Sequence, residues 1–197
     1  MTTSMSLGLV LFWAALAAMP GLAGDRDERP ATVNVDIRDY CDPATFNAVL
    51  GEGACVRDTT FGAITFPGFN AELGTEKSVG AWRFIPEAVK SEEDINFTLQ
   101  NLGGETHTFT RVKKFGGGFV APLNAASGNP VPAPECAQVV DGQLVPQPPS
   151  ANNVFVPAGA TVPGPQVDDD DHAKFQCCIH PWMRLTVNAS HRHGDRR

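Results

Sequence analysis

Short stretches of alternating hydrophobic and polar residues recur along the chain and predict β-strands. Residues 32–37 (Thr32 to Ile37) alternate strictly, as a strand with one buried face does. Further strand-like segments lie at residues 79–85, 95–100, 107–112, 154–159, 173–176 and 184–187. One short helix is expected at residues 43–50. Because 19 glycines and 16 prolines keep the segments short, the pattern predicts an all-β protein without internal repeats.

The pattern breaks down between Lys113 and Asn153. This stretch contains Gly116-Gly117-Gly118 and the proline-rich segment 146–149, so a long irregular connection is expected. A connection of this length in a compact domain is usually functional or tethered. Cys136, near its middle, is the candidate tether.

The two ends of the chain carry different signals. An uncharged apolar run, residues 6–19, precedes Ala23 and predicts a signal peptide over residues 1–23. An uncleaved anchor is the alternative, because no Lys or Arg precedes the run. We expect an N-terminal extension with a first strand and a stapled loop over residues 24–77, the main domain over residues 78–190, and a disordered tail over residues 191–197.

The net charge of −7 falls wholly outside the predicted signal peptide. Such acidity argues against a nucleic-acid partner and leaves no polybasic patch for a membrane surface. No other apolar stretch approaches the length of a membrane span. We expect the protein to be a monomer. The run Asp168–Asp171 lacks the ligand spacing of a calcium loop, so we interpret it as a solvated turn.

Five cysteines follow the predicted signal peptide, at positions 41, 55, 136, 177 and 178. An odd number outside the cytosol leaves one thiol unpaired, reactive or bound to metal. If Cys177 binds metal, the other four form two pairs, Cys41 with Cys55 and Cys136 with Cys178. The alternative is a vicinal disulfide between Cys177 and Cys178, which is strained and uncommon.

Residues 177–183, which we call the ligand loop, place Cys177, His180 and Met183 at positions i, i+3 and i+6. Zinc sites use cysteine, histidine and carboxylate ligands rather than a thioether. Blue copper sites use two histidines, one cysteine and a long axial methionine. The loop therefore predicts a second, distant histidine. His107 opens a predicted strand, whereas His172 follows the aspartate run and His191 and His193 lie in the tail.

Two segments resemble the cupredoxins of the plastocyanin and azurin type. They are residues 101–109, which end in Thr106-His107-Thr108-Phe109, and residues 175–184, which include the ligand loop. Residues 154–159 also resemble the strand and turn that precede the loop in this family. The resemblance, over about residues 79–188, implies a Greek-key β-sandwich with one type 1 copper ion. His107, Cys177 and His180 would be its trigonal ligands and Met183 its weak axial ligand.

The resemblance also implies roles for neighbouring residues. The spacing of three residues before His180 favours Cys177 over Cys178 as the thiolate, and alternating side-chain directions allow only one of the two to enter the site. Thr108 would clip the two ligand segments together by hydrogen bonds. The edge of His180 would be the electron port, with Pro181 and Trp182 in an apolar docking face. Core packing is the alternative for Trp182.

These features predict a protein exported to the periplasm or secreted, which carries single electrons to or from a redox protein partner. It is not expected to be an enzyme, because four protein ligands leave no open position for a substrate. A multicopper oxidase or nitrite reductase would need further copper sites, and a c-type haem needs Cys-x-x-Cys-His. The alternative function is a copper carrier or assembly protein that delivers copper without redox turnover. A purely structural sandwich is a further alternative.

Overall fold

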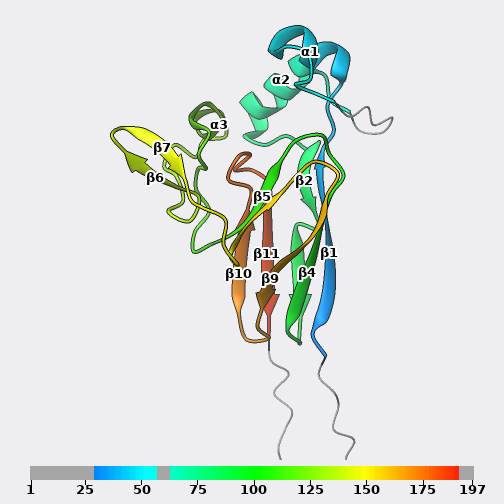
Figure 1. The fold of residues 1–197 in the computed structure, drawn as a ribbon, viewed down its shortest axis with the longest axis vertical. Helices are drawn as coiled ribbons and strands as arrows, with labels where there is room; N and C mark the ends of the chain where they lie inside the picture. The colour runs from blue at the N-terminus through cyan, green and yellow to red at the C-terminus, as the bar shows by residue number, and fades with distance from the viewer. Residues whose placement is uncertain (1–28, 57–62, 191–197) are drawn as a thin grey trace, which may run out of the picture.

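The computed structural model describes residues 29–56 and 63–190, which form a two-sheet β-sandwich capped at one end by helices (Figure 1). One sheet has the order β2-β1-β4-β9 and the other β3-β11-β10-β5-β8. The first comprises β1 (Ala31–Asp39), β2 (Trp82–Ile85), β4 (Ile95–Asn101) and β9 (Thr161–Val167). The second comprises β3 (Ala88–Ser91), β5 (His107–Val112), β8 (Asn153–Val156), β10 (His172–Gln176) and β11 (Arg184–Ala189). The prediction of an all-β sandwich is confirmed.

Strand β1 lies inside the first sheet, although the sequence analysis assigned it to an N-terminal extension. It pairs antiparallel with β2 and parallel with β4. Its alternation turns Val35, Ile37 and Asp39 toward the interior. The last of these inward positions holds a carboxylate, which reaches the end of the sandwich where the helices lie.

Aromatic side chains fill the space between the two sheets. Phe109 on β5 stacks on Phe175 on β10, with ring centroids 4.4 Å apart. Phe84 and Phe97, from the opposite sheet, meet the ring of Phe109 edge-on at 5.2 and 5.3 Å. All four rings are buried. They join the two sheets directly below the strand ends that carry the candidate ligands.

Two helices cover one end of the sandwich (Figure 1). Helix α1 (Pro43–Leu50) forms where it was predicted, because Asp42 caps its N-terminus and Pro43 opens its first turn. Helix α2 (Phe66–Glu76) was not predicted, because Pro67 and Gly68 resemble a turn. The Cys41–Cys55 disulfide joins the two sides of α1, as expected.

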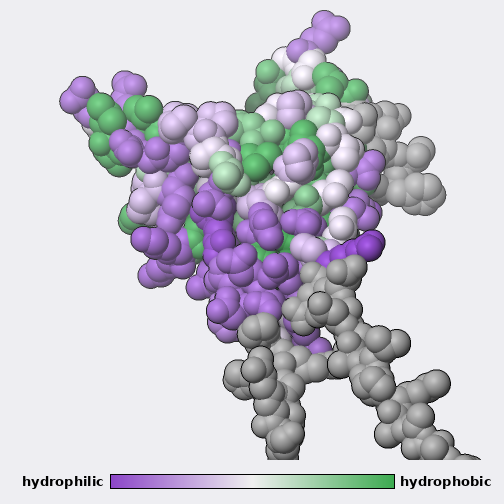
Figure 2. All heavy atoms as spheres, turned by 60° about the horizontal axis from the view of Figure 1, so that its bottom comes forward, coloured by the Kyte–Doolittle hydropathy of each residue, from purple (hydrophilic) through white to green (hydrophobic). Residues whose placement is uncertain are grey.

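The segment between residues 113 and 153 is more ordered than the sequence analysis predicted. It contains helix α3 (Ala121–Ala126) and a hairpin of β6 (Ala137–Val140) and β7 (Gln143–Pro146). Asp141 and Gly142, both with positive φ, make the hairpin turn, a signal that the sequence analysis overlooked. The hairpin projects from the sandwich (Figure 1) and exposes valines among hydrophilic residues (Figure 2).

A disulfide between Cys136 and Cys178 ties this segment to the ligand loop, as expected. The backbone approaches closely as well, since the N–H of Phe119 donates to the carbonyl of Cys178 at 2.9 Å. A Cβ atom at Gly118 would overlap that carbonyl, so the glycine run permits the contact. The mid-chain segment therefore supports the ligand loop from outside the sandwich.

Several strand predictions need correction. Strand β2 begins at Trp82 rather than at Val79, and β3 and β9 were missed. Strand β9 contains Pro163 and Pro165, which it tolerates because it lies at a sheet edge.

The aspartate run forms a turn between β9 and β10, in which the N–H of Asp171 donates to the carbonyl of Asp168. Hydrophilic residues gather at the end of the sandwich away from the helices (Figure 2). The predicted signal peptide and the tail with His191 and His193 fall outside the described residues. Among the described helices, none is long and apolar enough to cross a bilayer.

We predict that Phe109→Ala lowers the free energy of unfolding by roughly 3–5 kcal/mol, because it empties the centre of the aromatic core. Urea unfolding followed by fluorescence measures this change. Phe155→Ala on β8, at a partly exposed position, is the matched control and should cost clearly less. Equal losses at the two positions would contradict the central role of the Phe109 ring.

Candidate metal centre

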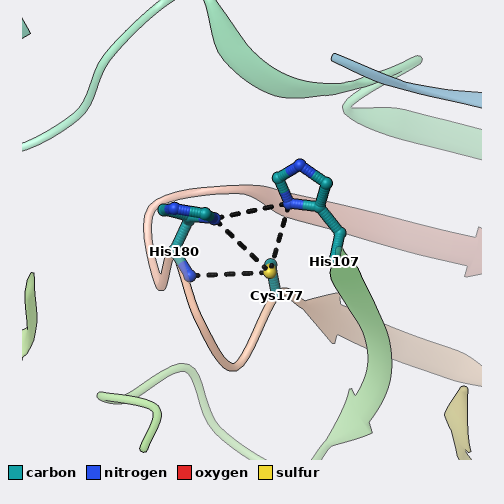
Figure 3. Close-up of side chains that lie close together, drawn as sticks. All are labelled: His107, Cys177 and His180. Atoms are coloured by element: carbon teal, nitrogen blue, oxygen red, sulfur yellow. Dashed lines mark hydrogen bonds between the residues drawn. The ribbon is translucent and has the colours of Figure 1, made fainter. Parts of the chain in front are cut away.

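Three side chains from two distant segments converge at the helical end of the sandwich (Figure 3). His107 is the first residue of β5, and Cys177 and His180 lie in the loop between β10 and β11. The Nδ1 atoms of His107 and His180 lie 3.7 and 4.0 Å from Sγ of Cys177, and 3.3 Å from each other. All three residues are buried. Within the described residues, this is the one group of three or more His, Cys, Asp or Glu side chains close enough to share a metal ion.

The ligand loop is closed by its own backbone. The N–H of Cys177 donates to the carbonyl of Met183 at 3.0 Å, and the N–H of Met183 donates to the carbonyl of His180 at 2.9 Å. Strands β10 and β11 continue this pairing from Gln176 and Arg184 onward. Cys177, His180 and Met183 are therefore held at one end of a regular ladder, and Met183 is buried.

Thr108 joins the two segments that carry the candidate ligands. Its backbone N–H donates to Sγ of Cys177 at 3.4 Å, and its hydroxyl accepts the N–H of Cys178 at 2.7 Å. A second N–H, from His180, points at the same sulfur at 3.5 Å. These are the contacts expected of a residue that clips the ligand segments together.

The two adjacent cysteines have different partners. Sγ of Cys178 forms the disulfide with Cys136, whereas Cys177 is the free thiol of the described chain. Neighbouring residues in extended backbone point to opposite sides, so Cys177 faces the histidines while Cys178 faces the mid-chain segment. The vicinal disulfide considered from the sequence does not form.

Each histidine has a carboxylate at its outer nitrogen. Nε2 of His107 lies 3.2 Å from Oδ2 of Asp39, and Nε2 of His180 lies 3.3 Å from Oε2 of Glu105. Sequence reasoning missed both carboxylates as parts of the site. The signal for Asp39 was its position two residues after Ile37 on the buried face of β1.

Mutual charge stabilises the ionised forms of the metal-free cluster. Burial alone would lower the pKa of His107, but hydrogen bonds to Asp39 and Cys177 outweigh it and raise this pKa to about 10. The pKa of His180 is also raised despite burial, by Cys177 and Glu105. Burial alone would raise the pKa of the Cys177 thiol, but the two histidines hold it well below its ordinary value. The directions of these shifts favour a negatively charged sulfur on Cys177 beside a protonated His107.

Little of Pro181 and Trp182, which the resemblance placed in an apolar docking face, lies at the surface. Pro181 is buried, and Trp182 is partly buried with its ring 6.0 Å from that of Phe69 on α2. His180 is only 5% exposed, because Trp82, Trp182 and Glu105 surround its ring. Phe69 on α2, a helix that the resemblance did not cover, contributes to the burial of Trp182.

The donor set fits copper. One cysteine sulfur and two imidazole nitrogens are the three strong ligand types of a blue copper site. They lie where one end of a two-sheet sandwich brings a strand start and a strand-to-strand loop together. The two-sheet sandwich and the buried His-Cys-His cluster are the features that the resemblance to cupredoxins implied.

No protein-family model and no curated protein sequence matches the chain. The chain is similar to solved cupredoxin structures, among them a purple cupredoxin from Nitrosopumilus maritimus. That match has 14% identity and a TM-score of 0.31, and covers 59% of this chain and 93% of the other. Auracyanin B matches with 18% identity and a TM-score of 0.32, covering 82% of this chain and 91% of the other.

The chain is also similar to Fet3p, a multicopper oxidase that functions in iron import. This match has 14% identity and a TM-score of 0.29, and covers 93% of this chain but 37% of the oxidase. Because TM-scores of this size carry no argument about function, the interpretation of the site rests on its own donor atoms and on the topology.

The raised pKa of His107 predicts that metal binding displaces protons. At pH 7 a group with a pKa of about 10 is protonated, and its imidazole must lose that proton to bind a metal. We expect binding of Zn²⁺ to the metal-free protein at pH 7 to release at least one proton per ion. Titration calorimetry in buffers of different ionisation enthalpy measures this number. Binding without proton release would contradict the imidazolium–thiolate description.

Proposed function

We propose that this protein is an exported type 1 copper protein that carries one electron at a time. The observation that carries the proposal is the buried His107–Cys177–His180 cluster, in which Cys177 is a free, buried thiol. Bound copper would supply a one-electron couple between its +2 and +1 states. The task of the chain is to hold one donor geometry in both states, so that electron transfer needs little rearrangement.

Three features of the chain restrict that rearrangement. The strand pairing fixes His107 and the two ends of the ligand loop. Thr108 ties the loop to β5, and the Cys136–Cys178 disulfide ties it to the mid-chain segment. Two backbone N–H groups, from Thr108 and His180, point at the sulfur of Cys177 and keep its lone pairs oriented.

Met183 is proposed as the weak axial ligand. It is 1% exposed, and its backbone closes the ligand loop by hydrogen bonds to Cys177 and His180. A fourth protein ligand would leave no open position for a substrate, so we propose an electron carrier rather than an enzyme. Pro181 and Trp182 are proposed to form part of the face through which electrons enter or leave. Trp182 is the partly exposed residue of the two.

We propose that the partner is another redox protein, located outside the cytosol. We also propose that this chain acts as a monomer. Two disulfides suit the periplasm or an extracellular location, where thiols are oxidised. The alternative, a carrier that delivers copper itself, is less favoured. Its donor atoms would have to reach an acceptor, whereas Cys177 has no exposed surface.

The absorption spectrum of the copper-loaded protein tests the copper site directly. Protein loaded with Cu(II) should show intense thiolate-to-copper absorption and a narrow copper hyperfine splitting in electron paramagnetic resonance. Cys177→Ser should abolish both. The control is the double variant Cys136→Ser and Cys178→Ser, which removes the disulfide without leaving a second thiol and should keep the colour. A colourless copper complex of the wild-type protein would reject the type 1 assignment.

Electron transfer and copper delivery differ in what leaves the protein. For an electron carrier, we expect fast, reversible reduction and reoxidation in stopped-flow experiments while copper stays bound through many cycles. Incubation with a copper-binding peptide, followed by separation and metal analysis, gives the opposite test. Ready loss of copper to the peptide together with sluggish redox cycling would favour the delivery function instead.

A further inference from the structure

The two histidines of the site point the same ring nitrogen inward and the same ring nitrogen outward. Each presents Nδ1 to the cluster and Nε2 to a carboxylate, which is Asp39 for His107 and Glu105 for His180. A ring nitrogen that carries a proton cannot bind a metal ion. A carboxylate that accepts a hydrogen bond from Nε2–H therefore keeps the lone pair of Nδ1 directed into the site.

Asp39 is itself rigidly held. Its Oδ1 accepts the N–H of Gly104 at 2.7 Å, and its Oδ2 accepts the N–H of Glu105 at 2.6 Å. A Cβ atom at Gly103 would overlap the carboxylate, so this turn fits closely around it. Asp39 is 2% exposed, and burial without such partners would be costly for a carboxylate.

The same contacts place the second carboxylate. The N–H of Glu105 is bound by Asp39, and the carbonyl of Glu105 accepts the side-chain amide of Asn101 at 2.7 Å. Both peptide groups that flank the Cα atom of Glu105 are therefore fixed, while its side chain, 34% exposed, bridges His180 and solvent. Burial alone would raise the pKa of Glu105, but His180 lowers it.

We propose that Asp39 and Glu105 are paired positioning residues, which fix the two copper-binding histidines through their Nε2 atoms and add two negative charges beside the site. The proposal rests on the proposed metal-binding function. In this proposal, β1 and the turn before β5 help to set the metal affinity and the reduction potential.

The two negative charges beside the site should lower the reduction potential of bound copper. Negative charge stabilises Cu(II) more than Cu(I), because the oxidised site carries one more positive charge. Asp39→Asn and Glu105→Gln remove the charge but keep an oxygen that can accept from Nε2–H. Each variant should therefore keep the type 1 spectrum and raise the reduction potential. A tenfold change in the ratio of oxidised to reduced protein corresponds to about 59 mV for one electron.

Two control variants are available outside the site. Asp36→Asn lies on β1, where its carboxylate pairs with the partly exposed Arg38 rather than with the site, and Glu87→Gln lies at an exposed position between β2 and β3. Redox titration should leave the potentials of both controls at the wild-type value. A purely structural role for Asp39 and Glu105 predicts the wild-type potential in the two test variants as well.

Zn²⁺ affinity gives a readout that does not depend on copper chemistry. Mutation of the outer partner of a metal-binding histidine typically weakens metal binding by roughly tenfold to a hundredfold, and here the partner loses its negative charge. We expect Asp39→Asn and Glu105→Gln to weaken Zn²⁺ binding in this range, and the controls to leave it unchanged. If Asp39→Asn fails to fold, Glu105→Gln, on a partly exposed side chain, still decides the question.

Wild-type Zn²⁺ affinity and wild-type potential in the folded test variants would overturn the proposal, and so would a potential that falls. A failure of the proposed function has a different signature. In that case wild-type protein forms no coloured copper complex, whereas the Zn²⁺ measurements still report whether the carboxylates position the histidines.

Discussion

The buried thiolate of Cys177 is the group on which the arrangement of this molecule depends. A thiolate without solvent is stable only beside positive charge and hydrogen-bond donors. The chain supplies them from separate segments: two imidazoles, the N–H of Thr108 and the N–H of His180. In the metal-free protein the raised pKa of His107 keeps a positive charge beside the sulfur, and a bound metal ion would supply positive charge at the same position.

The surrounding fold serves to keep those groups together. The aromatic core joins the two sheets below the site, the Cys136–Cys178 disulfide supports the ligand loop from the side, and helices α1 and α2 close the end. Strand β1 contributes Asp39, which binds His107 and the turn that presents Glu105. The cap and the two carboxylates set this site apart from one in which a histidine edge faces solvent.

Much of the fold and the chemistry at the cluster could be predicted from the sequence. The cysteine count required an unpaired thiol, and the resemblance together with strand alternation pointed to Cys177. The other four cysteines could then be paired as the structure has them. Contacts between distant segments could not be predicted in this way. Asp39 is a single carboxylate at the end of a strand, and only the register of β1 against β2 and β4 brings it to His107. Helix α2 and the hairpin of β6 and β7 were missed because proline, glycine and exposed valines hide their periodicity.

We propose that one end of the β-sandwich holds copper by two imidazoles and one thiolate, with carboxylates behind the imidazoles. X-ray absorption at the copper edge, on protein loaded with one copper ion, tests this claim most directly. It should reveal one short copper–sulfur bond and two imidazole nitrogens in both oxidation states, with little change between them. Coordination by nitrogen and oxygen alone, or a large change of ligands on reduction, would contradict it.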